Sequence, residues 1–361
     1  MAQIEPMDLD QPAPPRARDV LARRLADIVG LPSSRLTPRE RWIVADLLHD
    51  LLRASDETLR QRVAQRLSTL NEAPHRLLRM LATDRFEVAR PILEDCQALT
   101  DFDMLEIVQT GTIQHRTLVA RREDVSETVA AALAAYGEPE VVERLLKNKT
   151  AILAAPTVDH LVGMALDNAR FAPLLIRREE LRPAQAFRLF WGCDGTDRRA
   201  ILDRFAVDRT ILIDASEDIF PMAQAEGWSD PLVGRILRYI DRRQRNREAI
   251  AMSPFVSLEQ AMEALRREGV RRELVSEIAT LSGIDDRLMT RMFDDLAGEP
   301  LAVLCKATGL KWENFQAGWA GLGRSEGPIM DQARHVYDML SVEKAQTVLR
   351  YWNLSHEADR D

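Results

Sequence analysis

Apolar residues recur along nearly the whole chain with the period of an α-helix, and this pattern constrains the fold most. From residue 44 they stand at Val44, Leu47, Leu48, Leu51 and Leu52, the spacing that lines one side of a helix. Similar stripes follow within residues 59–70, 141–146, 158–166 and 329–340. The periodicity therefore predicts an all-α protein built from short helices.

Local signals mark several helix starts. Thr37-Pro38-Arg39-Glu40 and Ser257-Leu258-Glu259-Gln260 have the order of a capping box, in which the first and fourth residues each bond the other's backbone N–H. Asp194, before Gly195 and Thr196, predicts a turn. His115 is expected to form a hydrogen bond where a helix begins, rather than to act in acid–base catalysis.

One segment of the sequence recurs at a fixed offset. Leu118–Val125 returns 56 residues later as Leu174–Leu181, and a diverged copy lies 26 residues upstream of the first. Units of about 26–30 residues with two short helices cannot bury their own apolar sides, so they are expected to stack. Chance similarity of two arginine-rich helices is the alternative. If the units stack, Arg121-Arg122 and Arg177-Arg178 are expected to form ion pairs between them.

Several short segments together resemble a known family. They are Asp50–Leu52, Ala64–Leu67, Ala73-Pro74, Leu81–Asp84, Val88–Leu93, His115–Arg122, Leu145–Asn148 and Pro300–Ala307. With these segments the chain is similar to an uncharacterised alphaproteobacterial family of HEAT-like helical proteins, known only as a domain of unknown function. The resemblance implies a cytoplasmic α-α superhelix, and it carries over no catalytic residue.

The pattern of prolines, charges and helices predicts three parts. Residues 1–18 are expected to be a disordered, acidic and proline-rich tail. Residues 19–250 are expected to form HEAT/armadillo-like helical repeats that end in a basic helix. Residues 251–361 are expected to form a smaller helical C-terminal domain.

The basic helix is the sharpest local feature. Between residues 234 and 247 six arginines stand against one acid, Asp241, and they are Arg235, Arg238, Arg242, Arg243, Arg245 and Arg247. Such a surface suits phosphate groups or an acidic protein, because arginine forms paired hydrogen bonds with anions. A solvated helix that links two domains, with its charges paired to nearby acids, is the alternative. Trp191 and Trp228 are further candidates for partner binding, because tryptophan and arginine are enriched at binding hot spots.

Charge and cysteine usage narrow the classes of function. The net charge of −8 argues against a general nucleic-acid binder, and no run of about 18 uncharged apolar residues predicts a membrane span. The first residues do not resemble a secretory signal. Cys96, Cys193 and Cys305 lie about a hundred residues apart, so we expect reduced thiols rather than disulfides or a zinc site. No catalytic, cofactor-binding or metal-binding residue is predicted.

The sequence thus favours a non-enzymatic adaptor or scaffold, of regulatory function, that binds a protein partner in a bacterial cytoplasm. The alternative is a ligand-sensing module that holds an anionic small molecule, such as a nucleotide or cyclic dinucleotide, at the arginine-rich helix and the domain junction. Nucleic acid is not expected as a partner. The sequence leaves open whether the chain forms a homo-oligomer.

Overall fold

The computed structural model describes residues 15–31, 35–70, 72–123, 125–206 and 245–358. These residues form 21 α-helices and two short 3₁₀-helices, and none of them lies in a strand, which confirms the all-α class. The chain divides into two compact units, Met1–Met164 and Ala165–Asp361. The domain boundaries expected at residues 18 and 250 stay predictions.

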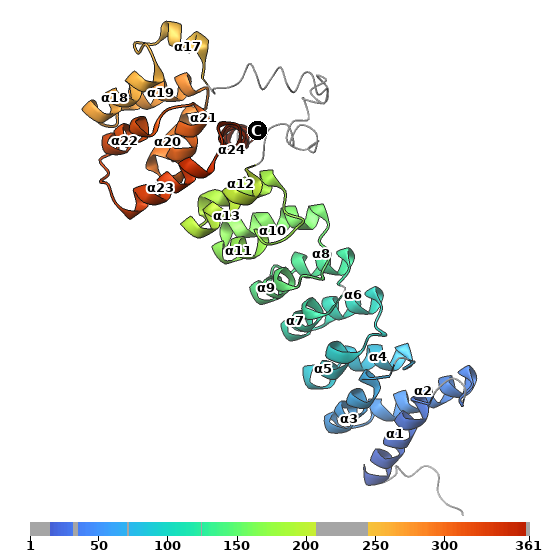
Figure 1. Cartoon of the computed structure of the whole chain (residues 1–361). Helices are drawn as coiled ribbons and strands as arrows, with labels where there is room; N and C mark the ends of the chain where they lie inside the picture. The colour runs from blue at the N-terminus through green and yellow to red at the C-terminus, as the bar shows by residue number, and fades with distance from the viewer. Residues whose placement is uncertain (1–14, 32–34, 71, 124, 207–244, 359–361) are drawn as a thin grey trace, which may run out of the picture. The chain divides into compact units, whose positions relative to one another are not determined.

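The helices of the first unit form two rows (Figure 1). In one row α3 packs against α5, α5 against α7, and α7 against α9; in the other α2 packs against α4, and α6 against α8. The helices are α1 (Pro15–Val29), α2 (Pro38–Arg53), α3 (Glu57–Ser68), α4 (His75–Ala82), α5 (Phe86–Asp95), α6 (Asp101–Thr110), α7 (Ile113–Arg121), α8 (Glu127–Ala135), α9 (Pro139–Lys147) and α10 (Ala155–Asp167), which crosses the division between the units.

The predicted helix starts are largely confirmed. Thr37 and Glu40 form a complete capping box at the start of α2. At Asp194 the sequence predicts only a turn, and the structure starts a helix there: Asp194 accepts hydrogen bonds from the backbone N–H groups of Thr196 and Asp197. Ser257 also caps a helix, but the Gln260 side chain accepts from the N–H of Val256, so the second half of the expected box is absent there.

His115 has the structural role that the sequence predicts. Its Nδ1 lies 2.8 Å from the Thr112 hydroxyl, and its Nε2 lies 3.0 Å from the carbonyl oxygen of Asp84. Burial lowers the pKa of His115 below its usual value of 6.5, so the ring stays neutral at pH 7. Both nitrogens are therefore used to hold the start of α7.

Hydrogen bonds at a regular sequence spacing join the helix ends of the first unit. Arg122, which ends α7, donates to the carbonyl oxygens of Leu93 and Cys96 at the end of α5, at 2.6 Å each. Asn148, which ends α9, donates in the same way to Ala120 and Arg122 at the end of α7. These bonds satisfy carbonyls that a helix end leaves unpaired. Cys96, Arg122 and Asn148 stand 26 residues apart, the offset seen in the sequence.

The expected ion pairs between units are wrong for Arg122 and stay a prediction for Arg121 and Arg177. Arg122 does reach the preceding helix pair, but its partners are backbone carbonyls rather than acids. Arg178 forms an ion pair with Glu180, two residues further along the chain. The sequence shows the charged residues, but it does not show the carbonyl oxygens that a helix end leaves unpaired. These oxygens also accept hydrogen bonds from a guanidinium.

The second unit is built around α21 and α24. α21 packs against α23 and α24, and α18 packs closely against α22, where a Cβ at Gly321 would lie 2.5 Å from the backbone of Leu265. The helices of this unit are α11 (Ala172–Leu175), α12 (Pro183–Leu189), α13 (Gly195–Phe205), α17 (Arg247–Met252), α18 (Leu258–Glu268), α19 (Arg272–Ser282), α20 (Asp286–Asp294), α21 (Glu299–Ala307), α22 (Trp312–Gly321), α23 (Pro328–Met339) and α24 (Val342–Ala358), with 3₁₀-helices at Ala169–Phe171 and Phe190–Gly192.

Candidate protein-binding face

Three large aromatic side chains stand in solvent on one row of the first unit, the row of α2, α4, α6 and α8. Trp42 of α2 is 64% exposed, Phe102 of α6 is 65% exposed, and Tyr136, which ends α8, is 43% exposed. Aromatic residues are costly to leave in water and are enriched where proteins bind one another. We call the surface that carries these three residues and the α4 side chains between them the aromatic face.

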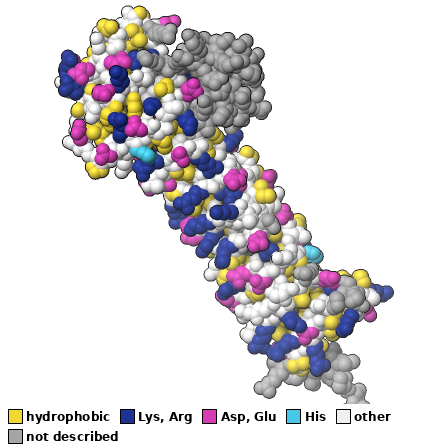
Figure 2. Space-filling model, viewed as in Figure 1, with side chains coloured by type: hydrophobic (Ala, Val, Ile, Leu, Met, Phe, Trp, Pro, Cys, Tyr) yellow, Lys and Arg dark blue, Asp and Glu magenta, His cyan; other side chains and the backbone are white. Residues whose placement is uncertain are grey.

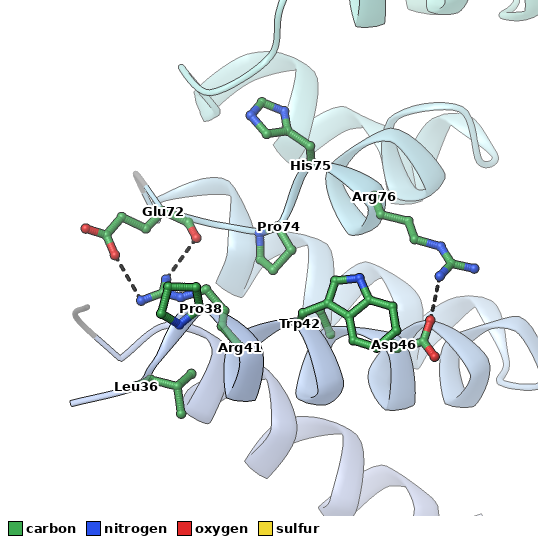
Figure 3. A pocket seen from close by; sticks show the side chains of 10 residues that line it. Leu36, Pro38, Arg41, Trp42, Asp46, Glu72, Pro74, His75 and Arg76 are labelled. Carbon is green, nitrogen blue, oxygen red and sulfur yellow. Dashed lines mark hydrogen bonds and ion pairs between the residues drawn. The ribbon is translucent and has the colours of Figure 1, made fainter. Parts of the chain in front are cut away.

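Trp42 borders a groove between α2 and α4 (Figure 3). The groove has a volume of about 460 Å³, and its apolar lining consists of Leu36, Pro38, Trp42, Ala45 and Pro74. Figure 3 shows the Trp42 indole between the two prolines on one side and Asp46 with Arg76 on the other. An apolar side chain of a partner would fit against the indole and the proline rings.

Ion pairs hold both ends of this groove. Arg76 lies 2.5 Å from Asp46, and Arg41 lies 2.9 Å from the Glu72 carboxylate. Arg41 also donates to the carbonyl oxygens of Glu72 and Leu31, at 3.0 and 2.7 Å. These bonds tie α2 to α4 and to the segments that precede each helix, so the groove is fixed before any partner arrives.

Phe102 is held against α4 by a charged residue. The Arg79 guanidinium lies 5.3 Å from the centre of the Phe102 ring, and it pairs with Glu106 one turn further along α6. Arg79 also lies 3.3 Å from Asp103, a buried carboxylate that forms a capping box with Thr100. Phe102 therefore keeps one ring face against the guanidinium while most of its surface meets solvent.

Tyr136 is fixed in a similar way at the end of α8. The Arg116 guanidinium lies 4.3 Å from the ring centre, and it forms a double hydrogen bond with Glu138. The Tyr136 hydroxyl donates to the carbonyl oxygen of Gln109 on α6 at 3.3 Å. Phe102 and Tyr136 are thus exposed rings that arginine contacts hold in place, an arrangement that reduces the entropy lost on binding.

The opposite row of helices has a different surface. Figure 2 shows basic side chains over α3, α7 and α9, with acidic side chains among them. Several of these charges pair within one helix, as Arg90 does with Glu94 and Lys147 with Glu143. Such a mixed, paired surface is typical of a solvated side.

Most of the residues predicted from the sequence to bind a partner or an anion lie outside the described residues. These are Trp228, Arg235, Arg238, Arg242 and Arg243, and the structure describes only the backbone of Arg247, which begins α17. Arg245 is already engaged, because it forms two hydrogen bonds with Glu259 and a third with the carbonyl oxygen of Thr308. The anion-binding hypothesis for this helix therefore stays a prediction.

Trp191 lies in an aromatic cluster of the second unit. Its ring centre is 5.0 Å from that of Trp352, and the Arg291 guanidinium lies 4.3 Å from the Trp191 ring. Phe190 packs edge-on against it. Trp191 is thus a half-buried residue that packs within this cluster, and its part in partner binding stays a prediction.

Sequence reasoning missed Trp42, Phe102 and Tyr136, although a signal was present for one of them. Phe102 stands opposite the buried side of α6, which consists of Asp103, Met104, Ile107 and Val108. An aromatic residue on the polar side of an amphipathic helix marks a candidate contact residue.

None of the described helices combines the length and the apolar composition that crossing a bilayer requires. Among the described residues, no group of three or more histidine, cysteine, aspartate or glutamate side chains is arranged to hold a metal ion.

The fold defines an all-α protein with paired helices in its first unit. The chain belongs to the bacterial family described as "uncharacterised protein conserved in bacteria (DUF2336)", which it matches over residues 88–350. This range includes Phe102 and Tyr136, whereas Trp42 precedes it. No curated protein and no solved structure matches the chain.

Proposed function

We propose that the chain is a non-enzymatic helical-repeat adaptor, with HEAT-like units, that binds a protein partner along its aromatic face in a bacterial cytoplasm. The observation that carries this proposal is the exposure of Trp42, Phe102 and Tyr136 on one row of helices. The hydrogen bonds repeated every 26 residues support the repeat interpretation, because stacked units need equivalent contacts at equivalent positions.

The chemistry of the face specifies the kind of partner segment. The groove beside Trp42 accepts an apolar anchor, while the exposed surface of Phe102 offers a second apolar contact. Arg76 and Arg79 lie between them, with side chains 59% and 41% exposed, and each is paired with an acid. We expect a partner segment that carries two or three apolar side chains. Charged residues between them would form new ion pairs with Arg76, Arg79 or the acids that now pair with these arginines.

Affinity purification of the tagged full-length protein from its native cells tests the proposal. We expect one protein near stoichiometric yield with the wild type, and its loss with the double variant Trp42→Ala, Phe102→Ala. Ile152→Ala is the matched control, since Ile152 is a comparably exposed apolar residue elsewhere in the unit.

The captured protein is then purified and titrated against the same variants. Truncation of one binding hot spot costs about 2 kcal/mol or more, so each single variant is expected to weaken binding by at least about 30-fold. A partner that binds the double variant and the wild type equally well contradicts the proposal. So does recovery of the protein alone in repeated, cross-linked preparations.

A further inference from the structure

The first helix pair of the chain keeps apolar side chains in solvent, separate from the aromatic face. Leu21 of α1 is 50% exposed, and Ile43 and Leu47 of α2 are 44% and 57% exposed. Leu47 belongs to the stripe that helical periodicity predicts to be buried. Within the part of the chain that the structure describes, no segment covers Leu21, Ile43 and Leu47 fully.

Two ion pairs show which sides of α1 and α2 face the next helix pair, α3 and α4. Asp27 of α1 lies 3.0 Å from Arg66 of α3, and Asp46 of α2 lies 2.5 Å from Arg76 of α4. Because each residue turns a helix by about 100°, Leu47 lies about 100° around α2 from Asp46, and Leu21 lies about 120° around α1 from Asp27. Leu21 and Leu47 are therefore turned away from the next helix pair, and Ile43 lies between Leu47 and Asp46, about 60° from Asp46.

The charges beside these apolar residues have opposite signs on the two helices. Arg24 is exposed and stands in line with Leu21 and Ile28, at spacings of three and four residues. Asp50, whose side chain is 72% exposed, stands in line with Ile43 and Leu47. The exposed Arg39 and Glu40 also stand in line with Ile43, so the surface has a basic residue on α1 and, on α2, two acids against one base.

We infer that this α1–α2 surface binds the same surface of a second copy of the chain. A twofold axis brings α1 of one copy against α2 of the other, so that each Arg24 meets an Asp50 and the apolar stripes meet in the middle. The two helices have 15 and 16 residues, which at 1.5 Å per residue makes each about 23 Å long. That length suits a four-helix bundle formed by the two pairs.

The two kinds of contact have different effects in this dimer. Burial of Leu21, Ile43 and Leu47 supplies most of the affinity, because apolar area leaves water. The Arg24–Asp50 contacts fix the register of the two copies. They also favour packing of α1 against α2, because packing of α1 against α1 would bring the two Arg24 side chains together.

Light scattering after size-exclusion chromatography of the full-length protein tests this inference. We expect a dimer at about 10 µM, and a dissociation constant raised at least about 100-fold by Leu47→Glu, since the variant loses apolar burial and places a charge in the interface. Ile152→Glu, at an equally exposed apolar position of the same unit, is expected to leave the dimer unchanged.

Charge exchange distinguishes a specific interface from general apolar association. Arg24→Glu and Asp50→Arg each place like charges together and are each expected to weaken the dimer by about tenfold. The double exchange restores the attraction and the wild-type dissociation constant. Circular dichroism checks that each variant keeps its helices.

Three results overturn the inference. The first is a monomer at about 100 µM for the wild type, a concentration far above that at which a specific interface of this kind dissociates. The second is a dimer that Leu47→Glu does not weaken. The third is a double charge exchange that weakens the dimer as much as the two single changes together, because the charges then do not meet across the interface. None of these results depends on the aromatic face, so the proposed function is tested separately.

Discussion

The Arg198 guanidinium lies 2.8 Å from the Asp295 carboxylate, and both side chains are about one-tenth exposed. A second carboxylate, that of the fully buried Glu299, lies 3.3 Å from the same guanidinium. Arg198 also donates to the carbonyl oxygens of Phe190 and Cys193. One cation thus joins the start of α13 to the start of α21, far apart in the sequence.

Arg198→Ala is expected to lower the free energy of unfolding by about 3–5 kcal/mol, because it leaves two buried carboxylates without their cation. Chemical denaturation monitored by circular dichroism measures the change. Arg199→Ala is the matched control, since Arg199 lies on the same helix and donates one 3.3 Å hydrogen bond to Gln332. The control is expected to cost less than about 1 kcal/mol. Equal effects of the two variants would contradict this role for Arg198.

Glu299 predicts a specific pH dependence. Burial raises the pKa of Glu299 above its ordinary value of 4.5, so the folded chain holds this proton more tightly than the unfolded chain does. The stability that this proton provides is complete below about pH 4.5 and is lost as the pH rises through the folded pKa. The wild type should therefore lose stability relative to Glu299→Gln over this range. Unfolding free energies of both proteins measured from acid to neutral pH test the sign, and a relative gain by the wild type with rising pH would contradict it.

Asn148→Ala is expected to destabilise the protein by about 1–2 kcal/mol, because the carbonyl oxygens of Ala120 and Arg122 lose their side-chain donor. Lys149→Ala, at the next and exposed position, is expected to change stability by less than about 0.5 kcal/mol. Thermal denaturation compares the two variants. A neutral Asn148→Ala would show that these helix-end bonds do not hold successive helix pairs together.

The three cysteines are expected to resist alkylation in the folded protein. Burial raises the pKa of the Cys193 thiol to about 12, and it also raises the pKa values of Cys96 and Cys305. The thiolate is the reactive form, so at pH 8 Cys193 should react roughly a thousandfold more slowly than a free thiol. Mass spectrometry after timed iodoacetamide treatment, with and without denaturant, measures the protection. Rapid labelling of Cys193 in the native protein would contradict the raised pKa of its thiol.

Local chemistry made part of this fold predictable. The Thr37 capping box, the Asp194 cap and the His115 hydrogen bond each depend on residues within four positions, apart from the bond from His115 to Asp84. The 26-residue offset was visible because equivalent helices need equivalent buried positions.

The candidate site was not predictable, because it depends on what covers each helix. Leu47 fits the buried stripe of α2 by periodicity, yet it is 57% exposed. Trp42 stands only one quarter turn from the buried side, so the sequence does not tell whether α4 covers it. The sequence points instead to the basic helix, because a cluster of charges can be read from a sequence, whereas exposure depends on how the helices assemble.

Site-specific photo-crosslinking in the native cells tests the central claim most directly. A benzophenone amino acid is introduced in place of Trp42, Phe102 or Tyr136, and in place of Arg144 on the opposite row as the control. If the aromatic face binds a protein partner, the first three positions crosslink to one and the same protein, and position 144 does not. Adducts at position 144 with none at the three aromatic positions would contradict the account.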